Sequence, residues 1–293
     1  MGLAALQMLG FRAAEYSSRP AGAPLCDTHA MTIVLIAAVL YVAAAALLWH
    51  SATGDGTPRR GWIPLAVLAV LFHAETHAEA WRLLQGADMH FFAALSLVGL
   101  GMTALTTAFG ASGRMPALGI VVFPLAAASL LAYRGYGHAD NASELGWRLQ
   151  LHAWMALLAY ATLALSAVLA IFLWAQERAL RRREFRRWLR ALPPLTELES
   201  LLFRSITVGF VLLSATLLTG LLFVDDLLAQ HLVHKTVLSV LSWLAFGALL
   251  LGRWQRGWRG AIAVRWTLAA MALLVLAFFG SKFVLELVLH RTG

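Results

Sequence analysis

Long apolar segments recur along the whole chain, and they constrain its fold more than any other feature. A helix that crosses a bilayer needs about 20 mainly apolar residues. The 293 residues are 60% hydrophobic and only 13% charged, so the chain lacks the polar surface of a water-soluble domain. We therefore predict an all-α fold, a polytopic membrane helical bundle with eight transmembrane helices. The predicted spans are residues 31–49, 62–80, 91–109, 117–133, 151–175, 203–224, 236–252 and 264–289.

Positive charges between these spans predict the direction of the bundle. Short connections rich in Lys and Arg stay on the cytoplasmic side of a membrane. Segment 177–190 carries seven arginines and segment 253–263 carries three, whereas segment 225–233 carries two aspartates and neither Lys nor Arg. Further arginines on the predicted cytoplasmic side are Arg59, Arg60 and Arg114. The alternation of the spans then predicts that both termini lie on the outer (periplasmic) side.

The first 30 residues do not fit the membrane domain. They contain Arg12, Arg19 and two prolines, and they lack the pattern of a signal peptide. We interpret residues 1–30 as an N-terminal extension. One hypothesis for it is translation from an upstream start, and the other is a short disordered extension. Residues 31–289 then form a single eight-helix transmembrane domain.

Cysteine content and net charge exclude several classes of protein. Cys26 is the only cysteine, which excludes a disulfide framework, a thiolate metal site and a CxxC redox pair. The formal net charge of +8 comes from arginines between the apolar segments, as membrane topology requires. The partner that this pattern predicts is the lipid bilayer, and we do not expect nucleic acid.

Histidines provide the first functional hypothesis. Ionisable residues inside or at the edge of a bilayer are costly and often functional. His73 lies inside a predicted span, whereas His152 and His234 lie at the starts of two others, all toward the predicted outer side. Neutral imidazole suits iron and other transition metals, so these three are candidate haem or metal ligands. We interpret His77 and His231 as surface histidines.

Other residues could support a bound ligand. Lys282 and Glu286 are four residues apart on one face of the last span, and they form either an intrahelical pair or part of the site. Lys235 follows His234 directly. Trp154 and Trp243 lie inside predicted spans, where they could stack on a flat ligand.

Several segments resemble the cytochrome c assembly family, the CcsA/CcmC/HemX-like integral membrane proteins. Segment 234–260 reads HKTVLSVLSWLAFGALLLGRWQRGWRG, and Lys235, Trp243 and the GWRG turn carry the match. Segment 151–170 matches through His152 and the pair Tyr160-Ala161, and His73 matches the histidine of another family helix. The closing GSKFVLEL resembles most closely the YpjD-like inner-membrane branch. The resemblance covers most of residues 31–289.

The resemblance implies haem binding at the outer face of the bacterial cytoplasmic (inner) membrane, in the service of cytochrome c biogenesis. Haem is the implied cofactor, His73 and His152 are implied ligands of its iron, and lysines such as Lys235 and Lys282 could pair with its propionates. Other cytochrome biogenesis proteins are implied partners. Segment 224–235, VDDLLAQHLVHK, has no tryptophan, so the haem-presenting motif of cytochrome c synthases is absent. We therefore predict a haem-handling relative and expect no catalytic residue.

Two alternative functions remain open at this point. One is a proton- or cation-coupled transporter, in which His73, Glu75, Lys282 and Glu286 would form a relay. Such a carrier often has inverted repeats and broken helices, which the sequence does not display. The other is a non-catalytic assembly factor whose polar cluster only stabilises the bundle.

Overall fold

The computed structural model describes residues 23–53, 60–84, 86, 88–113, 115–136, 146–183, 192–223 and 233–280. Within these ranges every regular element is helical, which confirms the all-α prediction. The helices are α2 (Ala23–Thr53), α3 (Trp62–Leu84), α4 (Phe91–Ala111), α5 (Gly119–Tyr136), α6 (Trp147–Arg181), α7 (Leu195–Phe223), α8 (Val233–Arg256) and α9 (Ala261–Val275). A short 3-10 turn, η1 (Pro116–Leu118), precedes α5, and a π turn, η3 (Leu276–Gly280), follows α9.

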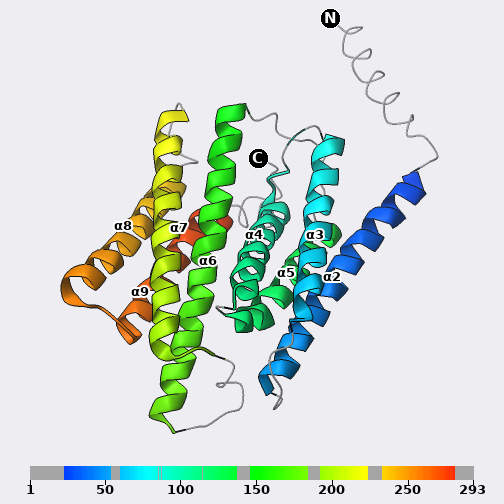
Figure 1. Cartoon of the computed structure of the whole chain (residues 1–293). Coiled ribbons are helices and arrows are strands. Elements are labelled where there is room, and N and C mark those ends of the chain that lie inside the picture. Colours follow the sequence, from blue (N-terminus) through cyan, green and yellow to red (C-terminus); the bar gives the residue numbers. More distant parts are fainter. Residues whose placement is uncertain are drawn as a thin grey trace, which may run out of the picture.

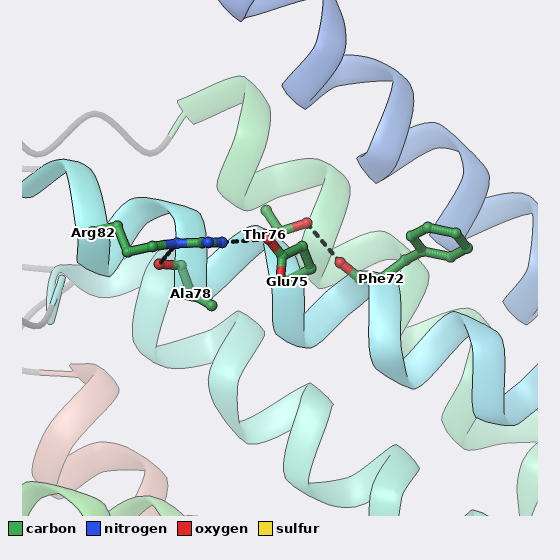
Figure 2. Close-up of polar contacts among 5 residues, drawn as sticks. All are labelled: Phe72, Glu75, Thr76, Ala78 and Arg82. Carbon is green, nitrogen blue, oxygen red and sulfur yellow. Dashed lines mark hydrogen bonds and ion pairs between the residues drawn. The ribbon is translucent and has the colours of Figure 1, made fainter.

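Seven of the described helices are long and apolar enough to cross a membrane, so the chain is a multi-pass membrane protein. Helix α3 is not among the seven, because its second half carries Glu75, Glu79 and Arg82. Figure 2 shows Arg82 reaching back along α3 to form an ion pair with Glu75 on an exposed face. Arg82 also donates from Nε to the carbonyl oxygen of Ala78 at 3.2 Å. That α3 is the eighth span stays a prediction.

The first and last of the predicted spans differ from the observed helices in their bounds. Helix α2 begins at Ala23, before the predicted first residue of the membrane domain. Helix α9 gives way to the π turn after Val275, and residues 281–289 of the predicted last span lie outside the described residues. Residues 1–22 also lie outside them, so the N-terminal extension stays a prediction.

The helices form two packed groups. Helices α2 to α5 pack on one another as an N-terminal sub-bundle, and α6 to α9 as a C-terminal sub-bundle. In Figure 1, α2 and α3 lie on one side of the molecule, α7 and α8 lie on the other, and α9 overlaps α7 in this view. Helices α4 to α6 lie between the two sides. Buried apolar side chains of α4 and α6 belong to one continuous core, so α4 packs against both sub-bundles.

Small residues let α4 and α6 approach closely. A Cβ added to Gly101 of α4 would lie only 2.7 Å from the Cβ of Ala161 on α6. Gly209 of α7 likewise leaves room for the side chain of Leu163 on α6. Small residues at such crossings are typical of membrane bundles, where close van der Waals packing drives helix association.

Arginines gather at one end of the bundle, which we call the arginine-rich end. Arg60 precedes α3, Arg181 ends α6, and Arg256 ends α8. Consecutive helices run in opposite directions, so these three positions come to the same end (Figure 1). The start of α6, the start of α8 and the ends of α3 and α9 face the opposite end.

A buried carboxylate closes the arginine-rich end. Glu199 of α7 is 4% exposed. It accepts hydrogen bonds from Nε of Arg259 at 2.8 Å and from the backbone N–H of Gly260 at 2.9 Å. Gly257 and Gly260 have φ angles of 65° and 54°, a region that favours glycine. The GWRG turn therefore joins α8 to α9 and fastens both to α7.

Candidate functional site

Histidines of the described residues occupy two different polar settings, one in each sub-bundle. His73 lies in α3 within the N-terminal sub-bundle, and His152 lies near the start of α6 in the C-terminal sub-bundle. The two side chains have hydrogen-bond partners of the same kind, hydroxyl groups, but not in the same number.

His73 is fully buried, and both of its ring nitrogens are engaged. Nδ1 lies 3.2 Å from the hydroxyl of Tyr41 on α2, and Nε2 lies 2.9 Å from Oγ of Ser96 on α4. The ring of Tyr41 also meets the imidazole edge-on and stacks on Phe123. Neither nitrogen of His73 is thus open to a metal in this arrangement.

A single backbone carbonyl fixes the direction of these hydrogen bonds. Thr103 donates its hydroxyl hydrogen to the carbonyl oxygen of Leu100 at 2.9 Å, and a carbonyl can only accept. Thr103 Oγ1 must therefore accept from the hydroxyl of Tyr41 at 3.0 Å. The Tyr41 oxygen in turn accepts from His73, so the hydrogen of the neutral imidazole is on Nδ1.

The same logic extends to the second histidine of α3. Because Nδ1 of His73 carries the hydrogen, its Nε2 accepts from Ser96. Ser96 has then used its only hydrogen, so it accepts from Nε2–H of His77 at 2.9 Å. We call this connected set the histidine chain, and its members are His77, Ser96, His73, Tyr41 and Thr103.

His77 is not a surface residue, so that interpretation of the sequence was wrong. Its ring is half-buried and stacks on Tyr133 of α5 at a centroid distance of 4.7 Å. The hydroxyl of Tyr133 donates to Asp88 at 3.3 Å, and Asp88 also pairs with Nδ1 of His90. Sequence reasoning missed His90, although an aspartate two residues before a histidine at a helix start was a visible signal.

Asp88 is a stable carboxylate at neutral pH. Burial raises its pKa, but the hydrogen bonds and charge of His90, with the hydroxyl of Tyr133, lower it further than burial raises it. The net result is a pKa below the ordinary value for aspartate. A negative charge therefore lies beside the His77 end of the histidine chain.

His152 has a different arrangement, with one ring nitrogen engaged. Nδ1 lies 3.1 Å from Oγ1 of Thr219 on α7. Thr219 donates its own hydrogen to the carbonyl oxygens of Ala215 at 2.9 Å and Thr216 at 3.0 Å. Thr219 must therefore accept from Nδ1–H of His152, which leaves the lone pair on Nε2. Within the described part of the chain, Nε2 has no hydrogen-bond partner.

His152 lines a mainly apolar pocket of about 170 Å³ at the end of the bundle opposite to the arginines. Tyr160 is the other polar side chain of the lining, and its hydroxyl donates to the carbonyl oxygen of Leu274 at 2.6 Å. Gly220 leaves room beside the imidazole, because a Cβ there would lie 3.2 Å from Cε1 of His152. The remaining lining residues are Met89, Val98, Ala153, Ala156, Leu157, Phe278 and Phe279.

Neither of the two predicted tryptophans, Trp154 and Trp243, lines this pocket. Trp243 donates from Nε1 to Ser214 at 2.8 Å and stacks on Phe210, away from the pocket lining. Trp154 is 40% exposed, and its ring lies 6.2 Å from that of Trp81.

Lys235 and His234 both belong to α8. Lys235 is half-buried at the start of α8. His234 belongs to the same helix, but its side chain lies outside the described residues, as do Lys282 and Glu286 altogether. Within the described residues, no group of three or more His, Cys, Asp or Glu could hold a metal ion on its own.

Comparisons with known proteins give long matches. The profile of the family described as Cytochrome C assembly protein matches residues 35–289. Inner membrane protein YpjD of Escherichia coli K12 is 29% identical over 265 residues, 87% of this chain and 98% of that protein. An uncharacterized 28.8 kDa protein of Azospirillum brasilense is 30% identical over 267 residues, 87% of this chain and 97% of that protein.

A shorter match involves a cytochrome c biogenesis protein. CcsA of Prochlorococcus marinus strain MIT 9515, named as such a protein, is 32% identical over 99 residues. This match covers 33% of the present chain and 31% of CcsA. No solved structure gives a significant match.

Proposed function

Because this chain belongs to the cytochrome c assembly protein family, we propose that it binds haem and handles it for cytochrome c-type biogenesis. The family match and the YpjD relatives confirm the resemblance predicted from the sequence. Haem handling goes beyond that match, and one feature of the structure supports it. That feature is His152, which lines an apolar, aromatic pocket and keeps a lone pair on Nε2 while Nδ1 bonds Thr219.

The residues of the pocket suit one face of a haem. An imidazole that ligates a metal commonly donates its other ring N–H to an oxygen, which fixes the tautomer and the orientation of the ring. Thr219 does this for His152. Tyr160, Phe278 and Phe279 supply the aromatic surface against which a macrocycle can pack and from which water is excluded. Haem would supply the redox-active iron, and Nε2 of His152 would ligate it.

The pocket must widen before it takes a whole macrocycle. Its volume of about 170 Å³ is below the range of about 300–1,000 Å³ typical of ligand sites. Phe278 and Phe279 belong to the π turn η3, and π turns of this kind are frequent at functional sites. We assign the widening to these two side chains.

We assign the ligand role to His152 rather than to His73. Iron could bind His73 only if a hydrogen bond to Tyr41 or Ser96 were broken within a fully buried site. A buried donor or acceptor left without its partner costs about 1–3 kcal/mol. His234 is the candidate for the second ligand, and Lys235, Lys282, Glu286, Trp154 and Trp243 are candidates for contacts with the edge of the haem.

The predicted topology gives the proposed site a side of the bacterial cytoplasmic membrane. We propose that the arginine-rich end is cytoplasmic, that α3 is the eighth span, and that both termini are periplasmic. The pocket lies toward the opposite end, because His152 is near the start of α6 and Phe279 belongs to η3, which follows α9. Haem would therefore be held toward the outer face, where apocytochromes are matured.

Titration of the purified protein with hemin tests this function. We expect the wild type to give a saturable Soret band that His152→Ala abolishes. The matched control is His50→Ala, since His50 is an exposed histidine at the end of α2. His73→Ala should keep iron coordination, provided that the variant remains folded. A wild type without a specific band, or a His152→Ala variant that binds hemin like the wild type, contradicts the proposal.

A further inference from the structure

We propose a second function for the N-terminal sub-bundle: the histidine chain is a proton path that opens at the end opposite to the arginines and stops inside the bundle. Its substrate is the proton itself. The inference rests on hydrogen bonds of α2, α3 and α4 and does not depend on haem binding by the C-terminal sub-bundle.

Unpartnered polar atoms lie beyond both ends of the histidine chain. Within the described residues, the buried side-chain atoms without a hydrogen-bond partner include Nε2 of His90 and Oγ1 of Thr106 and Thr107. The fourth such atom, Oε1 of Gln176, belongs to α6. A buried polar atom left alone is costly, so native proteins usually satisfy it with an ordered water. These atoms therefore indicate where water extends the histidine chain.

The two threonines continue the path from Thr103. Thr106 and Thr107 are three and four residues further along α4, so they lie on the same helical face, one turn closer to the arginine-rich end. They are 0% and 7% exposed, and water that bonds them would also lie within reach of Thr103. The hydroxyl of Thr103 would then have a third partner, besides the carbonyl of Leu100 and the hydroxyl of Tyr41.

Every member of the histidine chain can both donate and accept a hydrogen bond, so the whole chain can reverse its direction. A neutral imidazole exchanges its two tautomers, and a hydroxyl gives one hydrogen while it accepts another. His73 can pass a proton between its two nitrogens in this way, because one faces Ser96 and the other faces Tyr41. An apolar side chain at any of these positions would interrupt the path.

A proton crosses the histidine chain by a series of hydrogen transfers between neighbouring side chains. Nδ1 of His77 takes up a proton, and the hydrogen on its Nε2 moves to Ser96. The hydrogen of Ser96 moves to Nε2 of His73, whose Nδ1 hydrogen moves to Tyr41. The last two steps pass a hydrogen from Tyr41 to Thr103 and one from Thr103 to the water beyond it. One proton enters and one leaves, and only N–H and O–H bonds change.

Acidic and aromatic groups form the open end. Asp88 is ionised at neutral pH, as its low pKa indicates, and its charge attracts protons to this end. Tyr133 joins the carboxylate to the histidine chain, since its hydroxyl bonds Asp88 while its ring covers His77. His77 is itself half-buried rather than sealed.

Apolar side chains close the other end. A Cβ on Gly110, the next residue of that face of α4, would lie 2.6 Å from the ring of Trp62. Trp62, Phe123 and Leu48 are 4%, 0% and 4% exposed and pack in one cluster. The path therefore stops at Trp62, which makes it a site that loads a proton from one side and not a channel.

Proton flux into liposomes tests both the path and its closure. The protein is reconstituted with pyranine inside, and a pH gradient is applied with potassium and valinomycin present. We expect the wild type to match empty liposomes and Trp62→Ala to conduct. Adding Ser96→Ala to Trp62→Ala should lower the flux about tenfold or more, because a positioned proton-transfer group is lost. Ser166→Ala is the matched control in the same background, since Ser166 is an equally buried helical serine of α6.

Two outcomes of this experiment overturn the proposal. One is a folded Trp62→Ala variant that conducts no better than the wild type. The other is a flux that Ser96→Ala and Ser166→Ala change equally, which would mean leakage through a general defect. Hemin is absent from these liposomes, so neither outcome bears on the proposed haem binding.

A second measurement keeps the proposal testable if Trp62→Ala does not fold. The imidazole N–H of His73 can be followed by NMR in protein with 15N-labelled histidine after transfer to deuterated water. We expect exchange that is fast for a fully buried group and about tenfold slower or more in Ser96→Ala, with Ser166→Ala like the wild type. Equally slow exchange in all three proteins overturns the proposal.

Discussion

The tautomers of His73 and His152 are fixed in the same way, but the second ring nitrogens of the two histidines have different surroundings. In each case a threonine hydroxyl gives its hydrogen to a carbonyl of its own helix and thereby fixes the imidazole tautomer: Thr103 through Tyr41 for His73, and Thr219 directly for His152. The second nitrogen of His73 bonds Ser96, whereas His152 makes no second hydrogen bond within the described residues and lines an apolar pocket. One histidine is therefore bonded at both ring nitrogens, and the other keeps a lone pair on Nε2.

The comparison depends on the close contact between the two sub-bundles, and the largest effect is expected there. Gly101→Leu forces a side chain into a gap where even a Cβ would lie 2.7 Å from Ala161. We expect a loss of about 3 kcal/mol in the free energy of unfolding in detergent, because overpacking displaces α4 from α6. Gly135→Leu is the control, since nothing lies within 4 Å of a Cβ at that position of α5. Equal effects of the two substitutions would contradict a tight α4–α6 contact.

The two sub-bundles each contain an Arg–Glu ion pair, Arg82–Glu75 and Arg259–Glu199, whose contributions to stability should differ. Arg259→Ala removes the partner of Glu199, the buried carboxylate at the arginine-rich end. We expect a loss of about 2 kcal/mol, less than for a fully buried pair because Arg259 itself is 56% exposed. Arg82→Ala removes the partner of Glu75 from an exposed pair and should cost under about 1 kcal/mol. Thermal unfolding of both variants checks the order, and a larger effect at Arg82 would contradict it.

The sequence predicted the helices well, because their signal is local. Eight spans were predicted from apolar segments, and seven of the described helices are long and apolar enough to cross a membrane. The eighth segment forms α3, whose charges already distinguished it in the sequence. Charge at the segment ends also predicted which connections share the arginine-rich end. Each of these inferences needs only the length and composition of one segment.

The site was less predictable, because it depends on how helices rotate against one another. His73 and His77 were placed on one face of α3, but nothing in the sequence indicated that Ser96 would lie between them. The tautomer of each imidazole depended on Thr103 and Thr219, two threonines among many in apolar helices. Tyr41 was missed for the same reason, since a tyrosine in an apolar span resembles ordinary core.

The affinity for hemin tests whether the hydrogen bond between Thr219 and His152 contributes to ligand binding. Thr219→Val removes the oxygen that accepts from Nδ1 and leaves the size of the side chain almost unchanged. We expect the dissociation constant for hemin to rise about tenfold, which corresponds to ~1.4 kcal/mol, because the ring loses its fixed tautomer and orientation. Thr103→Val is the control from the histidine chain and should leave hemin binding unchanged. Equal losses in both variants would mean that the threonine acts on folding and not on the ligand.

The smallest effect is expected at Asp88, where the open end of the histidine chain depends on a charge. Its pKa in the folded protein is below the ordinary value of about 3.9, so the ionised form stabilises the fold at higher pH. This contribution is fully present above that ordinary value and is lost as pH falls through the lower folded pKa. His77, His90 and Tyr133 are the titratable groups that interact with it, and Arg134 acts on Tyr133.

The free energy of unfolding of Asp88→Asn near pH 7 should therefore be about 1 kcal/mol lower than that of the wild type, because the variant lacks the carboxylate that bonds His90. The difference should shrink as the pH of the detergent solution is lowered below about 4, where the wild-type carboxyl becomes protonated as well. Tryptophan fluorescence during denaturation at several pH values measures both quantities. A difference in unfolding free energy that stays constant down to pH values below the ordinary pKa range of aspartate would show that Asp88 acts through its shape. The His77 end of the histidine chain would then lack the charge that attracts protons to it.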